Sequence, residues 1–259
     1  MPFWIESQST PVMVLLVLSL CYSLTALIFV GARILRRYPV ATYLKATTPT
    51  MLTPLSAILA LLLAFLAARV WTNLDHANTY AAQEASAIND TILLSSTLPG
   101  ELPSTMRNSM HKYVHFVAVQ DESAMKENRA ELRLLPPGLT DGLDALLSFN
   151  PATPAQQITQ ERTEAAIERV LEARRDRIVL NEATIGPIQW IVILILSTVV
   201  LLVIAMVHID WPVTVALNLF LFSTAVAVCL ILIMVNDRPF SHGGASLDLR
   251  ALQQVDPIN

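Results

Sequence analysis

The sequence predicts an all-α integral membrane protein, with four transmembrane helices in two hairpins and a helical soluble insert between helices two and three. Its four apolar segments cover residues 12–32, 51–68, 188–207 and 211–235, and none contains Asp, Glu, Lys or Arg. Each is close to the roughly 20 residues that an α-helix needs to cross the hydrocarbon core. A composition that is 54% hydrophobic and only 15% charged agrees, because soluble domains carry more charge.

The order of apolar and polar segments predicts the domain organisation. We expect a first transmembrane hairpin over residues 1–71, a helical soluble insert over 72–186, a second hairpin over 187–236 and a C-terminal tail over 237–259. No Lys or Arg precedes the first apolar segment, and no small-residue cleavage site follows it, so we expect it to stay as a membrane helix rather than act as a signal peptide.

Basic residues near the membrane help to predict the orientation, but they occur on both sides of the membrane. The loop between the first two helices carries Arg33, Arg36, Arg37 and Lys45 and no acid, which favours a cytoplasmic loop and an extracytoplasmic insert. The opposite side also carries basic residues: Arg69, Arg174, Arg175, Arg177 and Arg238. The first hairpin often dominates orientation, so we lean towards an extracytoplasmic insert.

The first half of the insert has helical patterns. Residues 77–94 are rich in alanine and predict a helix that Pro99-Gly100 terminates. A second helix is expected to begin after Pro103, with Ser104 as its N-cap, and to continue towards Arg129.

The second half combines an irregular stretch with a long helix. Residues 134–154 contain several Pro, Gly and Asn turn residues, which leave room for a short helix around 143–147. Residues 158–180 form a long amphipathic pattern in which Ile167 and Leu171 share an apolar face.

Candidate chemistry is sparse. His111 and His115 are four residues apart on a predicted helix, but no third metal ligand is evident. Phosphate-binding, serine-hydrolase and dinucleotide-binding motifs are absent from the sequence, and the sequence pI is near 5.7. We therefore expect no enzyme, no cofactor or metal, and no nucleic-acid partner.

The second predicted helix carries the most suggestive pattern. Ala57, Leu61, Phe65 and Arg69 follow one another at four-residue spacing and so share a face. If several copies surrounded an axis with this face inward, apolar rings would form a constriction and Arg69 a cationic ring. Alternatively, Arg69 reaches lipid headgroups and Phe65 packs on a neighbouring helix.

Short motifs along nearly the whole chain carry a family resemblance. They are Phe65 and Trp71 near the end of helix two, Glu84-Ala85, the Tyr113 region leading to Asp121-Glu122, the run from Arg174 to Arg177, and Arg238-Pro239-Phe240 with Gly243-Gly244 close behind. With the two-plus-two helix plan, the sequence resembles the bestrophin-like domain family, bacterial membrane proteins distantly similar to bestrophin anion channels.

The resemblance implies a bacterial inner-membrane protein that forms a homo-oligomer, pentameric by analogy, with helix two lining a central pore. Bestrophins hold their soluble helices in the cytosol, which conflicts with the charge-based orientation. The simplest interpretation of Glu84, Arg174 and Arg177 is ion pairing with unassigned partners, and that of Pro239-Phe240 is a helix stop.

Two hypotheses of different classes follow. The first is an oligomeric ion channel that favours anions. The second is a non-conducting membrane scaffold or sensor that binds a protein partner through the apolar face of residues 158–180. In either case membrane lipid is a partner.

Overall fold

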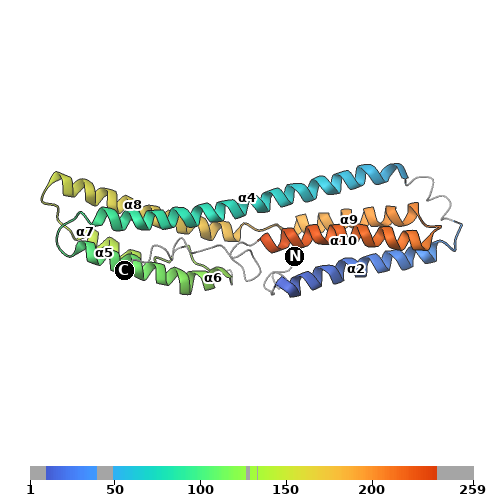
Figure 1. The fold of residues 1–259 in the computed structure, drawn as a ribbon, viewed down its shortest axis with the longest axis horizontal. Helices are drawn as coiled ribbons and strands as arrows, with labels where there is room; N and C mark the ends of the chain where they lie inside the picture. The colour runs from blue at the N-terminus through green and yellow to red at the C-terminus, as the bar shows by residue number, and fades with distance from the viewer. Residues whose placement is uncertain (1–9, 40–48, 127–128, 133, 238–259) are drawn as a thin grey trace. The chain divides into compact units, whose positions relative to one another are not determined.

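The structure is a computed structural model that describes residues 10–39, 49–126, 129–132 and 134–237. These residues form helices and no strand (Figure 1). In chain order the helices are α2 (Thr10–Leu35), α4 (Pro49–Ser95), α5 (Leu102–Phe116), the π-helix η1 (Val117–Asp121), α6 (Glu122–Lys126), α7 (Pro137–Leu147), α8 (Pro154–Glu182), α9 (Pro187–Val207) and α10 (Pro212–Asn236).

The chain divides into two compact units. Among the described residues the first contains residues 10–72 and 184–237, and we call it the apolar unit; the second contains residues 73–183, and we call it the insert. Helix α4 contributes its first half to the apolar unit and its second half to the insert.

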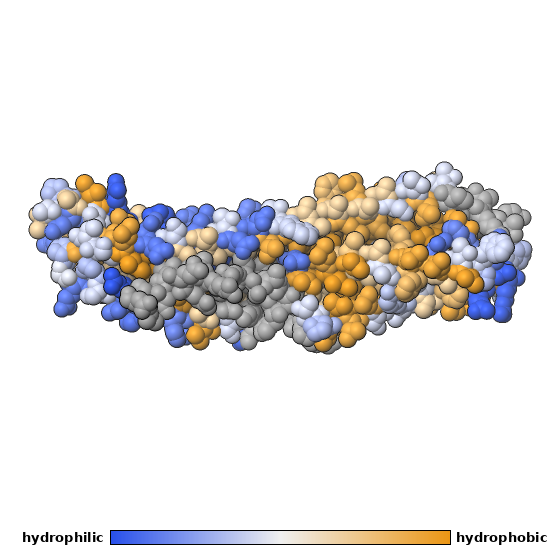
Figure 2. All heavy atoms as spheres, viewed as in Figure 1, coloured by the Kyte–Doolittle hydropathy of each residue, from blue (hydrophilic) through white to orange (hydrophobic). Residues whose placement is uncertain are grey.

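Helices long and apolar enough to cross a membrane occur four times in the described chain. They lie within Thr10–Leu35, Thr50–Ser95, Pro154–Val207 and Pro212–Asn236. On the face drawn in Figure 2, hydrophobic residues gather over the helices of the apolar unit, whereas hydrophilic residues gather over those of the insert. Side chains such as Ile188 and Val213 are 75% and 80% exposed, which suits contact with lipid rather than water. The described part of the chain is therefore all-helical, and four of its helices suit a membrane.

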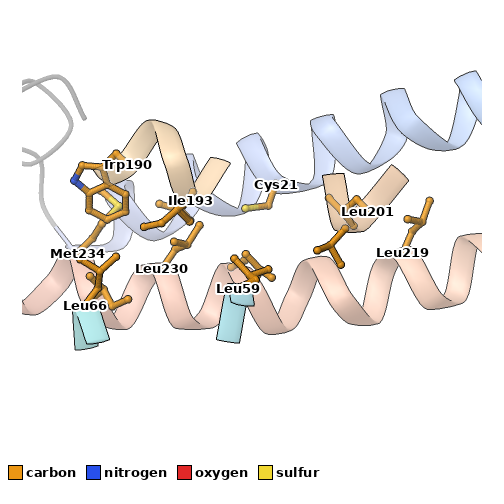
Figure 3. Packing of buried hydrophobic residues seen from close by; sticks show 14 of the residues in the cluster. Cys21, Leu59, Leu66, Trp190, Ile193, Leu201, Leu219, Leu230 and Met234 are labelled. Carbon is orange, nitrogen blue, oxygen red and sulfur yellow. The ribbon is translucent and has the colours of Figure 1, made fainter. Parts of the chain in front are cut away.

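The apolar unit is held together by hydrophobic packing of α2, α4, α9 and α10. Trp190 of α9 lies beside Met234 of α10 and near Leu66 of α4, and all three side chains are buried (Figure 3). The Tyr22 hydroxyl of α2 also lies 3.0 Å from the Thr224 hydroxyl of α10, a hydrogen bond between helices far apart in sequence. Such polar contacts are common between membrane helices.

Asp237 fixes the connection that leads into α9. Both of its carboxylate oxygens accept from the backbone N–H of Ile185, at 3.1 and 3.2 Å, and both residues are buried. This short segment between α8 and α9 belongs to neither helix, so its N–H needs an acceptor from elsewhere in the chain.

The insert packs α5, η1, α7 and α8 against the second half of α4. Its core includes Ile88, Met106, Leu146 and Val170. Helices α5 and α7 approach very closely at Gly138, where a Cβ would lie 2.3 Å from the Ser109 carbonyl oxygen and 2.5 Å from the Tyr113 nitrogen. Only glycine allows the two backbones to lie this close.

Two helices of the insert begin at other residues than the sequence predicts. Ser104 is not an N-cap: it lies within α5, whose N-cap is Glu101, and its hydroxyl donates to the Glu101 carbonyl at 2.7 Å. Helix α7 begins at Pro137, earlier than the short helix expected around residues 143–147, because proline is well suited to the first helical position.

Two helix boundaries predicted from the sequence also differ from those in the structure. The apolar segment and the alanine-rich helix that follows it form one continuous helix, α4. The helix expected to continue towards Arg129 changes to the π-helix η1 after Phe116, and α6 then ends at Lys126.

Candidate functional site

The four residues predicted to line a pore all lie on the exposed side of α4. Leu61 and Phe65 are 58% and 65% exposed, and Ala57 and Arg69 are exposed as well. We call these four residues the outer face of α4. No ion pair involves Arg69 within the described part of the chain.

The opposite side of the same stretch of α4 packs into the apolar unit. Leu59, Leu66 and Val70 are buried in its hydrophobic core. One side of the helix therefore supports the single subunit, while the outer face contributes nothing to its core. That division leaves the outer face available for lipid, for another subunit or for a pore.

The other predicted positions fall in different surroundings. Trp71 is 51% exposed on α4, whereas Glu84, Arg174 and Arg177 are buried in the insert. Pro239 and Phe240 lie outside the described residues.

Glu84 of α4 and Arg177 of α8 form a completely buried ion pair. The Arg177 Nε atom lies 2.9 Å from Glu84 Oε2, and Arg177 Nη2 donates to Glu84 Oε1 at 3.2 Å. The hydroxyl of Tyr113, from α5, also donates to Oε1. Glu84 therefore connects three helices through one carboxylate.

Asp121 and Arg174 form a second pair beside the first. The two guanidinium nitrogens Nε and Nη2 of Arg174 lie 2.6 and 2.7 Å from the two oxygens of Asp121, a bidentate arrangement. Arg174 Nη1 also donates to the Leu134 carbonyl at 3.1 Å, and its guanidinium lies 5.9 Å from the centre of the Phe116 ring.

The two pairs meet through Arg177, whose Nη2 atom lies 3.8 Å from Asp121 Oδ2. Two carboxylates thus face two guanidinium groups, so the formal charge of the cluster is zero. We call Glu84, Tyr113, Asp121, Arg174 and Arg177 the buried ionic cluster.

Hydrogen bonding in the cluster is incomplete on the Arg177 side. Arg177 Nη1 is buried and has no hydrogen-bond partner among the residues that the structure describes. The short Nε to Oε2 approach is also not aligned as a hydrogen bond, so we describe it as an ionic contact only. Because unpaired buried polar atoms are costly, Arg177 relies on the charge of its neighbours.

Burial and charge shift two pKa values in the cluster. Burial, the nearby carboxylate of Glu84 and the hydrogen bond to it raise the pKa of Tyr113 well above its ordinary range, despite an opposing effect of the two arginines. Burial has the largest single effect on the pKa of Arg177 and would lower it, but Glu84, Tyr113 and Asp121 together outweigh burial and raise this pKa overall. Tyr113 therefore stays neutral and Arg177 stays charged at any physiological pH.

The local sequence explains how these side chains converge. Ala81 and Ala85 flank Glu84 on α4 and are buried, and their small side chains leave room for a guanidinium. Arg174 and Arg177 are three residues apart on α8, so they lie on one side of that helix.

The π-helix η1 brings Asp121 into line with Tyr113. In a regular α-helix, two steps of four residues would rotate Asp121 by about 80° away from Tyr113. The wider turn of η1, which ends at Asp121, reduces this rotation, and Tyr113, Val117 and Asp121 are all buried.

This cluster ties helices together. It connects α4, α5, η1 and α8, and it was missed as a unit because its partners are distant in sequence. Elsewhere, no group of three His, Cys, Asp or Glu side chains among the described residues could hold a metal, and His111 and His115 gain no third ligand there.

Comparison with known proteins gives one result. The family model described as Bestrophin-like domain matches residues 18–247, which is most of the chain. Neither the curated proteins nor the solved structures contain a significant match.

Proposed function

We propose that this chain, which belongs to the Bestrophin-like domain family, is a subunit of a homo-oligomeric ion channel whose pore is lined by the outer face of α4. The oligomer is a pentamer by analogy with bestrophins. Its four membrane helices form two hairpins in a bacterial inner membrane, with the insert on the extracytoplasmic side by the charge of the first loop.

The exposure of the outer face carries this proposal. Leu61 and Phe65 are large apolar side chains that lie outside the hydrophobic core of one subunit. In a ring of subunits they would form apolar constrictions of the kind that gate by expelling water. The single subunit therefore leaves uncovered the surface that a pore would need.

Arg69 gives the proposed pore its preference for anions. It is exposed, and no described carboxylate neutralises it by an ion pair. A ring of such guanidinium groups would raise the local concentration of anions and repel cations.

The apolar face on which the scaffold hypothesis was based is covered in its middle, although Leu171 is partly exposed and Ile158 is 53% exposed. Ile167 and Ile178 of α8 are each 1% exposed and Val170 is fully buried, so this part of the apolar face packs inside the insert. Little of this face is therefore left for a protein partner. This favours the channel over the scaffold.

The test begins with the number of subunits. Cryo-electron-microscopy projections of the protein in nanodiscs should show a closed ring with α4 nearest the axis. A monomer, or an oligomer without a central axis, would overturn the proposal.

Bilayer recordings then test the pore face. Under a KCl gradient, wild-type protein should give a reversal potential of the sign expected for anions, and Arg69→Glu should reverse or abolish it. Arg162→Glu, which makes the same charge change at an exposed position of α8, should leave the sign unchanged. A ring that conducts equally with and without Arg69 would refute the role of Arg69 but not the channel itself.

A further inference from the structure

The C-terminal end of α2 and the beginning of α10 form a cleft with an unusual mixture of side chains. Helices α2 and α10 pack side by side, and the end of one lies near the start of the other (Figure 1). The cleft between them is lined by Phe29, Ala32, Arg33, Arg36, Ile209, Pro212 and Val215. Its walls are therefore apolar, apart from two guanidinium groups.

Arg33 lies in the last turn of α2, and Arg36 directly follows the end of this helix. Arg33 and Arg36 are three residues apart, so their side chains lie close together, where like charges repel. Both are exposed, and no described acid forms an ion pair with either of them. An anion placed between them would remove the repulsion and make two charge-assisted hydrogen bonds.

The surrounding residues place this cleft at the boundary of a membrane. Trp211, directly before α10, is 72% exposed, and tryptophan is enriched where hydrocarbon meets headgroups. Val30 and Ile34 on α2 and Val213 and Leu217 on α10 are more than half exposed, so both helices carry exposed apolar side chains near this end. A molecule that suits this surface has an anionic head and a hydrocarbon tail.

From these observations we propose that Arg33 and Arg36 bind the phosphate of an anionic phospholipid, whose acyl chains lie along the exposed apolar sides of α2 and α10. The cleft itself holds only about 10 Å³, too little for a phosphate, so the headgroup lies at its mouth, between the two guanidinium groups. The apolar walls formed by Phe29 and Val215 exclude water from the side of the site that faces into the cleft.

The balance of charge at this end supports an anionic rather than a zwitterionic headgroup. Arg33, Arg36 and Arg37 follow one another closely on the chain, while Asp210 supplies one carboxylate near the start of α10. A net positive end attracts an anionic headgroup, and a choline headgroup would bring its own cation next to the arginines.

Native mass spectrometry of the full-length protein tests the proposal directly. The protein would be purified with equal amounts of phosphatidylglycerol and phosphatidylcholine, and the ratio of retained lipids measured. Wild-type protein should retain an excess of phosphatidylglycerol. In Arg33→Gln/Arg36→Gln this excess should fall about 25-fold, since each arginine near an anionic surface contributes roughly a factor of five.

Arg37 supplies the matched control, because it is exposed, adjacent to Arg36 and absent from the lining of the cleft. Arg37→Gln should retain much more phosphatidylglycerol than Arg36→Gln, although both remove one positive charge. Equal losses in the two variants would mean that only the bulk charge of this end matters, and would overturn the site. So would a wild-type protein with no preference between the two lipids.

Thermal unfolding in detergent separates a lipid from a free phosphate. Added phosphatidylglycerol should raise the unfolding temperature of wild-type protein but not that of the double variant. Inorganic phosphate should leave the unfolding temperature of both proteins unchanged. If inorganic phosphate protects as well as the lipid, the site takes a free anion and the lipid assignment is wrong. Circular dichroism of the unheated variants confirms that each one is folded.

Discussion

Glu84 and Arg177 face each other with neither side chain exposed, and the Arg177 Nε atom lies 2.9 Å from Glu84 Oε2. The pair joins α4, which also carries the outer face with Arg69, to α8. Burying two charges is expensive, and well-packed apolar residues can often replace such a pair without loss. We infer that the buried ionic cluster fixes which helices pair in the insert rather than supplying most of its stability.

Breaking this pair on one side should be strongly destabilising. Arg177→Met leaves the buried Glu84 carboxylate without the positive charge of Arg177. We therefore expect the free energy of unfolding to fall by about 3–5 kcal/mol. In Glu84→Gln/Arg177→Met neither charge remains, and the loss should be smaller than the sum of the two single losses. Chemical unfolding of the protein in detergent would measure Arg177→Met, Glu84→Gln and the double variant.

The exposed ion pair between Lys112 and Asp141 is the control for that measurement. Its atoms are 2.7 Å apart, but the two side chains are 64% and 46% exposed. Lys112→Met should therefore cost less than about 1 kcal/mol. If Arg177→Met cost no more than Lys112→Met, the buried ionic cluster would have no special role in the insert.

Gly138 should tolerate no side chain. In Gly138→Ala the new Cβ would meet the Ser109 carbonyl and the Tyr113 backbone, which cannot move independently, so α7 must shift away from α5. We expect a loss of about 1–3 kcal/mol in the free energy of unfolding. Gly31→Ala is the comparison, because nothing lies within 4 Å of its Cβ and alanine favours helix. Equal effects at both positions would contradict the close packing of α5 and α7.

Asp237 should stabilise the segment between α8 and α9. Asp237→Ala removes the acceptor of the buried Ile185 N–H, and leaving such a group unpaired costs about 1–3 kcal/mol. The adjacent Asn236→Ala removes only a hydrogen bond to the Leu232 carbonyl of its own helix and should be milder. Hydrogen exchange of the Ile185 backbone amide would be the sharpest measurement. We expect it to be faster than in wild-type protein in Asp237→Ala but not in Asn236→Ala. Unchanged exchange would show that Ile185 is protected by other means.

The apolar helices could be predicted from sequence because their signal is local. A run of about 20 residues without charge has few alternatives to a membrane helix. The unbroken course of α4 could also have been predicted, since neither Pro nor Gly occurs between Pro54 and Pro99. The change from apolar to polar composition near Trp71 predicts the end of the first hairpin, and in the structure this position lies inside one continuous helix.

The pairing inside the insert could not be predicted in this way. Glu84 and Arg177 are 93 residues apart, and no single-sequence pattern connects them. Residues Pro137 and Gly138 resemble a helix breaker, yet proline occupies the first turn of α7 and glycine allows the contact with α5. The π-helix that orients Asp121 has no local sequence signature comparable to a cap or a turn.

Tyr113 should make the insert sensitive to alkaline pH. Its pKa is raised in the folded protein, so its proton is held more tightly there than in the unfolded chain. Its contribution to stability is complete below the unfolded pKa of about 10, and is lost as the pH rises from there towards the folded pKa. Wild-type protein should therefore lose stability above about pH 10 more steeply than Tyr113→Phe, which has no proton to lose at this position.

Thermal unfolding between pH 8 and 11 compares the slopes of wild-type protein and Tyr113→Phe. Tyr80→Phe, at a partly exposed tyrosine of α4, should keep the wild-type slope. If Tyr113→Phe and wild type lose stability in parallel, Tyr113 ionises no less readily in the folded protein than in the unfolded chain, and its hydrogen bond to Glu84 does not hold the proton.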